Sequence, residues 1–192
     1  MTAFDFRQVD VFAGERLKGN PLAVVIGADG LSDETMAAFA NWTNLSETTF
    51  LLKPTTQAAD YRLRIFTPSG ELPFAGHPTL GSCHVWLSLG HTPRQSHVVQ
   101  ECGAGLIRIK RDASRLAFAA PPLLRTGTVE ERLLDQIATG LRIHRSNIKA
   151  SQWIDNGPGW VAVLLGSRTD LLALRPDYTA LGHLKLGVVA PW

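Results

Sequence analysis

The chain has 192 residues, of which 45% are hydrophobic and 19% are charged, a composition typical of one large globular domain or two small ones. Its net charge of +2, without a basic cluster interleaved with aromatic residues, gives no support for nucleic-acid binding. The N-terminus lacks a signal-peptide core, and no segment approaches the roughly 20 apolar residues that span a bilayer. We therefore expect a cytoplasmic protein with no membrane association and two reduced cysteines.

The first half of the chain predicts strands and two helices. Apolar alternation in the first strand slips by one near Arg7 and Gln8, which predicts a bulge or a bend. Ser32 is a good N-cap for a helix with Met36 and Ala40 on one face. The other predicted strands lie at residues 22–26, 48–53, 61–66, 98–101, 106–110 and 115–119.

A second helix is predicted to begin near His77 and to stop before Gly90. It is apolar almost all round, so we expect it to be buried on all sides, with His84 packed. The histidines at positions 77, 84 and 91 recur every seven residues. Seven helical residues rise by about 10.5 Å, too far for ligands of one zinc ion, so no metal site is predicted.

Pro121 and Pro122 mark the best linker candidate. Beyond them, residues 128–131 resemble a capping box before an amphipathic helix with Leu134 and Ile137 on its face. No later segment is apolar all round. Many short strands with one buried helix indicate an α+β fold.

The helix start "AGHPT" could bind a carboxylate. Gly76 permits close approach to the backbone, His77 titrates near neutrality, and Pro78 costs no hydrogen bond in the first turn, so this N-terminus through Thr79 could attract an anion. The alternative, which these residues alone favour, is a glycine turn before a proline-started helix whose histidine bonds locally.

The segment "NLSETTF" places Glu47 between apolar residues, where a helix and loop give way to a strand. A carboxyl group in apolar surroundings has a raised pKa and can move protons near neutral pH. The alternative is an exposed acid at a strand edge, which the heptapeptide alone favours.

Four segments occur in the order seen in the PhzF family of phenazine-biosynthesis-like isomerases, and the chain resembles that family along nearly its whole length. They are "VDVFAGERLKGNPLAVV", "LSDETMAAFANWTNLSETTF", "YRLRIFTPSGELPFAGHPTLGSCHVW" and "IDNGPGWVAVLL". The resemblance implies a diaminopimelate-epimerase-like α+β fold with two similar lobes. Each lobe is a β-sheet rolled around a central helix, and the active site lies between the lobes. Residues 1–120 would form the first lobe, with its central helix from His77, and residues 123–192 a partial second lobe.

The resemblance also implies the site. Glu47 matches the glutamate that moves a proton when the family's characterised isomerase converts trans-2,3-dihydro-3-hydroxyanthranilate. Gly76 and His77 match substrate-contacting residues, Pro78 and Thr79 belong to the same motif, and Asn20 matches an asparagine near the site. We expect a cofactor-independent isomerase of a small carboxylate, with no metal and a homodimeric assembly. Glu47 and His77 would be catalytic, with Glu47 poorly solvated and near His77. The expected substrate-binding residues are Asn20, Gly76, Pro78 and Thr79.

Two departures from the family pattern qualify this expectation. Ala75 stands where two-cysteine epimerases of this fold carry a thiol, which disfavours a two-thiol racemase. Nothing after Trp160 matches the aspartate or the late Thr-Gly-Ser-Ala-like loop of the family's second lobe. The alternative hypothesis is therefore a C-terminally truncated, non-catalytic homologue that at most binds ligands or partners.

Overall fold

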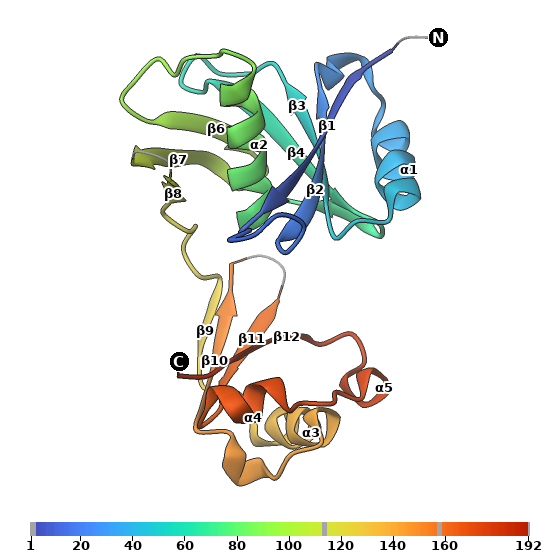
Figure 1. The fold of residues 1–192 in the computed structure, drawn as a ribbon, viewed down its shortest axis with the longest axis vertical. Coiled ribbons are helices and arrows are strands. Elements are labelled where there is room, and N and C mark those ends of the chain that lie inside the picture. Colours follow the sequence, from blue (N-terminus) through green and yellow to red (C-terminus); the bar gives the residue numbers. More distant parts are fainter. Residues whose placement is uncertain (1–2, 113–114, 157–158, 192) are drawn as a thin grey trace. The chain divides into compact units, whose positions relative to one another are not determined.

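The computed structural model describes residues 3–112, 115–156 and 159–191. The chain divides into two compact units, Met1–Pro121 and Pro122–Trp192 (Figure 1). The boundary falls between the two prolines that the sequence marks as a linker. Each unit has its own apolar core, and each is described by itself.

In the described part of the first unit, the strands form one sheet in the order β1-β2-β3-β4-β6-β7-β8, with β5 paired to β4. The β2–β3 and β4–β6 pairs are parallel and the others are antiparallel. The strands are β1 (Asp5–Val11), β2 (Asn20–Ile26), β3 (Thr48–Leu52), β4 (Tyr61–Thr67), β5 (Gly70–Leu72), β6 (Val98–Cys102), β7 (Gly105–Asp112) and β8 (Arg115–Phe118).

The sheet curls around helix α2 (Gly76–Ser88), which contacts β1, β2, β3, β4, β6 and β8 (Figure 1). Cys83 and Val85 on this helix pack against Leu22, Leu63 and other inner-face residues. The expectation that the helix is buried on all sides is wrong, because His84 is exposed and Leu80 is only half-buried. The sheet leaves this stripe uncovered between its two edge strands, β1 and β8.

Of the bulge or bend expected in β1, the bulge is absent, since the strand's residues pair one to one with β2 from Asp5 to Val11. The alternation slips because the strand is covered on different faces at its two ends. Phe6 packs edge to face against Phe39 of α1 (Asp33–Thr43), with 6.0 Å between the ring centroids. Val9 and Val11, in contrast, pack in the core that contains α2.

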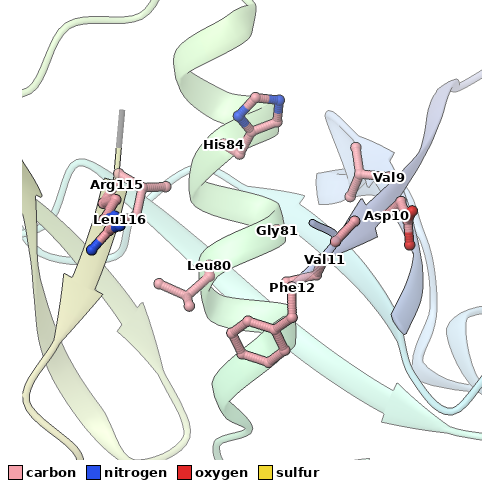
Figure 2. Close-up of a pocket in the computed structure, with 10 residues that line it drawn as sticks. Val9, Asp10, Val11, Phe12, Leu80, Gly81, His84, Arg115 and Leu116 are labelled. Carbon is pink, nitrogen blue, oxygen red and sulfur yellow. The ribbon is translucent and has the colours of Figure 1, made fainter. Parts of the chain in front are cut away.

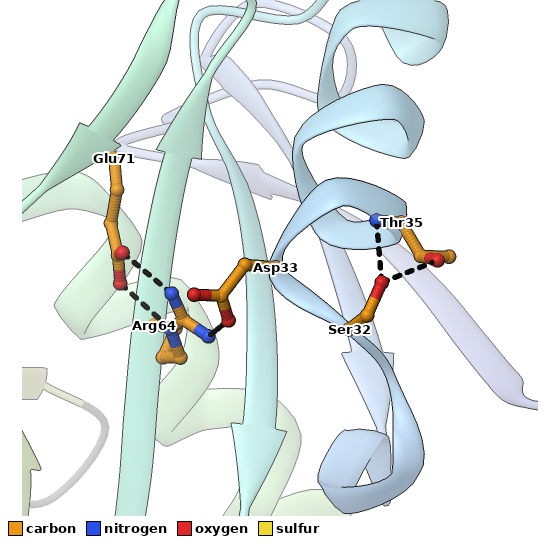
Figure 3. Close-up of polar contacts among 5 residues, drawn as sticks. All are labelled: Ser32, Asp33, Thr35, Arg64 and Glu71. Carbon is orange, nitrogen blue, oxygen red and sulfur yellow. Dashed lines mark hydrogen bonds and ion pairs between the residues drawn. The ribbon is translucent and has the colours of Figure 1, made fainter.

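Helix α1 covers the outer face of the sheet, where Met36 and Ala40 pack against Phe50 and Phe66. A 3-10 turn, η1 (Ala28–Gly30), precedes it. The predicted N-cap is confirmed: the Ser32 hydroxyl accepts a hydrogen bond from the Thr35 amide at 3.2 Å (Figure 3). The cap satisfies one of the first-turn amides that lack an intrahelical acceptor.

Arg64 on β4 ties the start of α1 to the short strand β5. Its guanidinium donates two hydrogen bonds to Glu71, at 2.8 and 2.6 Å, and pairs with Asp33 (Figure 3). Both carboxylates are substantially exposed, so we expect this cluster to fix local geometry more than it adds to stability.

The second unit has a four-stranded sheet in the order β12-β11-β10-β9, with β11 and β12 parallel. Trp153, Val161 and Val163 form its core with helix α3, on which Leu134 and Ile137 are buried. The elements are β9 (Arg125–Gly127), α3 (Glu131–Leu141), η2 (Arg145–Asn147), β10 (Ala150–Asp155), β11 (Trp160–Leu164), α4 (Arg168–Leu172), α5 (Tyr178–Leu181) and β12 (Lys185–Val189). Residues 157 and 158 of the segment quoted above lie outside the described residues.

The start of α3 differs from the expectation. The capping box at residues 128–131 is wrong, because α3 begins after Glu130, which makes no side-chain cap. The opposite sheet face carries Ile154 and Trp160, each 39% exposed, and Val189, 52% exposed. None of the helices described in this unit is apolar all round, as expected. That this unit is an incomplete second lobe remains a prediction.

Candidate functional site

Three elements of the first unit bring the predicted residues together. Asn20 is the first residue of β2, and Glu47 immediately precedes β3. Because β2 and β3 are parallel neighbours, the N-terminal ends of both strands lie at the same end of the sheet. His77 lies in the first turn of α2. All three residues therefore belong to one cluster.

Glu47 and His77 form the centre of this cluster. The Oε2 atom of Glu47 lies 3.5 Å from Nε2 of His77, and the two side chains are 16% and 8% exposed. Both atoms are buried, and neither has a hydrogen-bond partner among the described residues. The expected proximity of a poorly solvated Glu47 to His77 is thus observed; the catalytic roles remain predictions.

Burial sets the protonation of both groups. It raises the pKa of the Glu47 carboxyl, with the Ser46 side chain acting in the opposite direction. Burial also lowers the pKa of His77 to about 4. The imidazole is therefore neutral at pH 7, and its approach to Glu47 is not an ion pair at that pH. A carboxyl with a raised pKa beside a neutral imidazole is suited to proton transfer.

Asn20 joins the cluster through both ends of its side-chain amide. Its Nδ2 lies 3.3 Å from Nδ1 of His77. Its Oδ1 accepts a hydrogen bond from the Ser46 hydroxyl at 3.0 Å. Ser46 belongs to the quoted "NLSETTF" segment, but no local pattern indicates a role for it; its contact with Asn20, 26 positions away, brings it into the cluster.

The first turn of α2 offers free amides. Ala75, at the N-cap, makes no side-chain cap, and the first turn contains no acidic residue. The amides of Gly76 and His77 have no acceptor within the helix, whereas the Thr79 amide donates to the Ala75 carbonyl at 3.2 Å. An anion at this terminus would therefore meet Gly76 and His77.

The structure assigns Pro78 and Thr79 to packing. Both are buried; Thr79 is 0% exposed and its hydroxyl accepts a hydrogen bond from Gln100 at 3.1 Å. Gly76 also has a packing role: a Cβ atom there would lie 3.2 Å from the Phe118 ring. The Thr79 amide and hydroxyl are thus both hydrogen-bonded within the protein, and its substrate contact remains a prediction.

A separate groove of about 740 Å³ follows the uncovered stripe of α2. Figure 2 shows Leu80, Gly81 and His84 of the helix between residues of β1 and β8. Arg115 lies on one side and Asp10 on the other; the buried Oδ2 of Asp10 has no hydrogen-bond partner among the described residues. Neither Glu47 nor His77 lines this groove.

Within residues 3–112, 115–156 and 159–191, no group of three or more His, Cys, Asp and Glu is arranged to hold a metal ion. In the same residues, no helix is long and apolar enough to cross a membrane.

The first unit, a half-barrel sheet around a helix whose N-terminus meets a buried Glu–His pair, is of the α+β, diaminopimelate-epimerase-like class. The family model described as "Phenazine biosynthesis-like protein" matches residues 9–190. The chain belongs to this PhzC-PhzF family, as the sequence motifs indicate.

Individual relatives agree with this assignment. The chain is 42% identical to Antisense-enhancing sequence 1 of Schizosaccharomyces pombe, over 96% of this chain and 65% of that protein. It is 38% identical to trans-2,3-dihydro-3-hydroxyanthranilate isomerase of Pseudomonas aeruginosa, over 90% of this chain and 61% of that protein. A PhzF-family structure from Enterococcus faecalis superposes with a TM-score of 0.75 at 25% identity, covering 98% of this chain and 68% of that one. The chain thus spans less than two thirds of the length of these curated relatives.

Proposed function

We propose that this protein is a PhzF-type isomerase in which Glu47 carries a proton between two carbon atoms of a small carboxylate substrate, without a cofactor. The observation that carries the proposal is the buried approach of Glu47 to a neutral His77 at 3.5 Å. The isomerase named among the relatives acts on trans-2,3-dihydro-3-hydroxyanthranilate, and we take this compound as the first substrate to test.

The proposed step balances within the substrate. The Glu47 carboxylate removes a proton from carbon, and the C–H electron pair enters the neighbouring double-bond system. The resulting Glu47 carboxylic acid then returns the proton to a different carbon. No electrons leave the substrate, so no oxidant or reductant is needed. A raised Glu47 pKa favours this cycle, because it makes the carboxylate a stronger base.

Binding is assigned to the start of α2. The free amides of Gly76 and His77 and the positive end of the helix dipole favour a carboxylate there. A substrate carboxylate held at this terminus would lie beside Glu47, because His77 supplies both one of the free amides and the imidazole that faces Glu47. Bound and oriented in this way, the reacting carbon needs no free diffusion to meet the base.

The assembly and location of the protein are part of the same proposal. We expect a homodimer in the cytoplasm, and sedimentation velocity of the purified chain measures the oligomeric state directly. A chain that binds a carboxylate at the start of α2 without converting it is the second candidate, because the helix terminus favours an anion independently of Glu47.

The test is conversion of trans-2,3-dihydro-3-hydroxyanthranilate, followed by NMR, with purified wild type, Glu47→Gln and the control Glu15→Gln. The Gln side chain keeps the shape of Glu47 but cannot accept the proton, so we expect at least a 100-fold loss of kcat. The exposed Glu15 should be replaceable without loss. Normal turnover by Glu47→Gln contradicts the proposal, and binding without turnover by wild type supports the second candidate.

A further inference from the structure

The hydrogen-bond chain that begins at Ser46 has a direction. The Ser46 hydroxyl donates to Oδ1 of Asn20, and an amide oxygen can only accept. In this orientation the amide nitrogen, Nδ2, faces Nδ1 of His77 at 3.3 Å; a hydroxyl can accept as well as donate, so the Glu47 end of the imidazole decides against the flipped amide. Because Nδ2 is only a donor, Nδ1 has to be the acceptor. A neutral imidazole carries one proton, which this chain of bonds places on Nε2.

The other end of the imidazole gives an independent reason for the same proton position. Nε2 faces Oε2 of Glu47, and both atoms are buried without another partner among the described residues. If Nε2 were unprotonated, its lone pair would face a carboxylate oxygen. If the Asn20 amide were flipped, its Oδ1 would accept from an Nδ1–H of His77 and Nε2 would be unprotonated. That arrangement is compatible only with a protonated Glu47. An Nε2–H instead gives the carboxylate a donor.

We propose that Asn20 is a positioning residue: held by Ser46, it fixes His77 as the Nε2–H tautomer, so that the imidazole donates toward Glu47 and cannot receive the proton that Glu47 takes from the substrate. The proposal rests on the proposed role of Glu47. It replaces the expected substrate contact of Asn20, since Oδ1 and Nδ2 of its amide are both engaged within the protein.

The consequence for the reaction is that the proton stays on Glu47. Proton transfer from Glu47 to His77 would require an unprotonated Nε2 or a positively charged imidazole. The first is prevented by the bond to Asn20, and burial disfavours the second, because His77 has a pKa of about 4. The carboxylic acid form of Glu47 therefore keeps its proton until the substrate takes it back.

The tautomer can be measured directly on the protein labelled with ¹⁵N-histidine. Long-range ¹H–¹⁵N NMR at pH 7 distinguishes the protonated from the unprotonated ring nitrogen of His77. We expect a protonated Nε2 and an accepting Nδ1 in wild type. A dominant Nδ1–H tautomer, or an equal mixture, would overturn the proposal without any variant.

Three variants sharpen the test. Asn20→Asp replaces the donor with a carboxylate acceptor, which should draw a proton to Nδ1 and raise the His77 pKa. Ser46→Ala, which keeps Asn20 but frees its amide to turn, should give a mixture of tautomers. Asn41→Asp adds the same charge on α1, where Asn41 bonds only the Pro68 carbonyl among the described residues, and should leave the His77 signals unchanged.

Activity provides the second readout. Loss of the outer partner of a metal-bound histidine commonly costs 10- to 100-fold; by analogy, we expect Asn20→Asp to lower kcat by about this factor with little change in KM. If the His77 tautomer is unchanged in both Asn20→Asp and Ser46→Ala, the positioning role is wrong while the Glu47 role stands. If Glu47→Gln keeps its turnover, the proposed function fails, whatever the tautomer spectra show.

Discussion

Acidification should destabilise the protein through His77. The unfolded-state pKa of histidine is near 6.5, and burial lowers the pKa of His77 to about 4 in the folded state. Between these values the unfolded state binds the proton and the folded state does not. The stability associated with neutral His77 is therefore present above pH 6.5 and is lost as the pH falls toward 4.

The magnitude follows from the difference between the two pKa values. Each pKa unit corresponds to about 1.36 kcal/mol, so the free energy of unfolding should lose about 2 kcal/mol by pH 5 and about 3 kcal/mol by pH 4 through this residue. Carboxyl groups titrate in the same range, so the contribution of His77 has to be isolated by a variant.

Urea unfolding of wild type, His77→Gln and His84→Gln at pH 7, 5 and 4 isolates that contribution. Gln does not titrate, so the stability difference between wild type and His77→Gln should shrink by about 3 kcal/mol from pH 7 to pH 4. The exposed His84 on the same helix is the matched control for replacing a histidine by Gln at a solvent-facing position. A pH-independent difference for His77→Gln would refute the assignment of a buried, neutral imidazole.

Two further predictions concern packing and charge. In Gly81→Ala, the new Cβ would lie 2.6 Å from Leu22 Cδ2 and 2.8 Å from Val11 Cγ2, so we expect the free energy of unfolding in urea to fall by about 1 to 2 kcal/mol. Gly30→Ala is the control and should change this free energy little, because the space around Gly30 is open. Equal stability of the two variants would contradict the packing described around α2. Arg64→Met should lower the free energy of unfolding by no more than about 1 kcal/mol in low salt and by less in high salt, because the Asp33 and Glu71 side chains are 75% and 41% exposed. A larger loss of stability that persists in high salt would show that the Arg64 cluster contributes more than an exposed ion pair.

The sequence predicts the local structure of the first unit well where one physical rule dominates. Ser32 caps α1 as expected, and Gly90 follows the end of α2 with a positive φ of 87°. Prediction from the sequence fails where one element lies in two different environments. The slip in β1 looks like a bulge in a single sequence, but it reflects coverage by α1 at one end and by α2 at the other.

The candidate site shows the same division. Glu47 and His77 are predicted through the resemblance to the PhzF family, because the residues alone favour an exposed acid and a locally bonded histidine. The sequence cannot show that Asn20 bonds His77 across 57 positions, or that Ser46 orients Asn20. Nor can it show that Thr79 faces Gln100 in the core. These contacts arise only when β2, β3 and α2 come together.

The most direct test of Glu47 as the proton carrier uses a substrate deuterated at the carbon that loses its proton. After a single turnover in ordinary water, NMR and mass spectrometry of the product locate the deuterium. Because the Glu47 side chain is only 16% exposed, we predict that wild type delivers part of the label to the new carbon, while Glu47→Gln gives no conversion. Conversion by Glu47→Gln with the same transfer of deuterium would contradict the account.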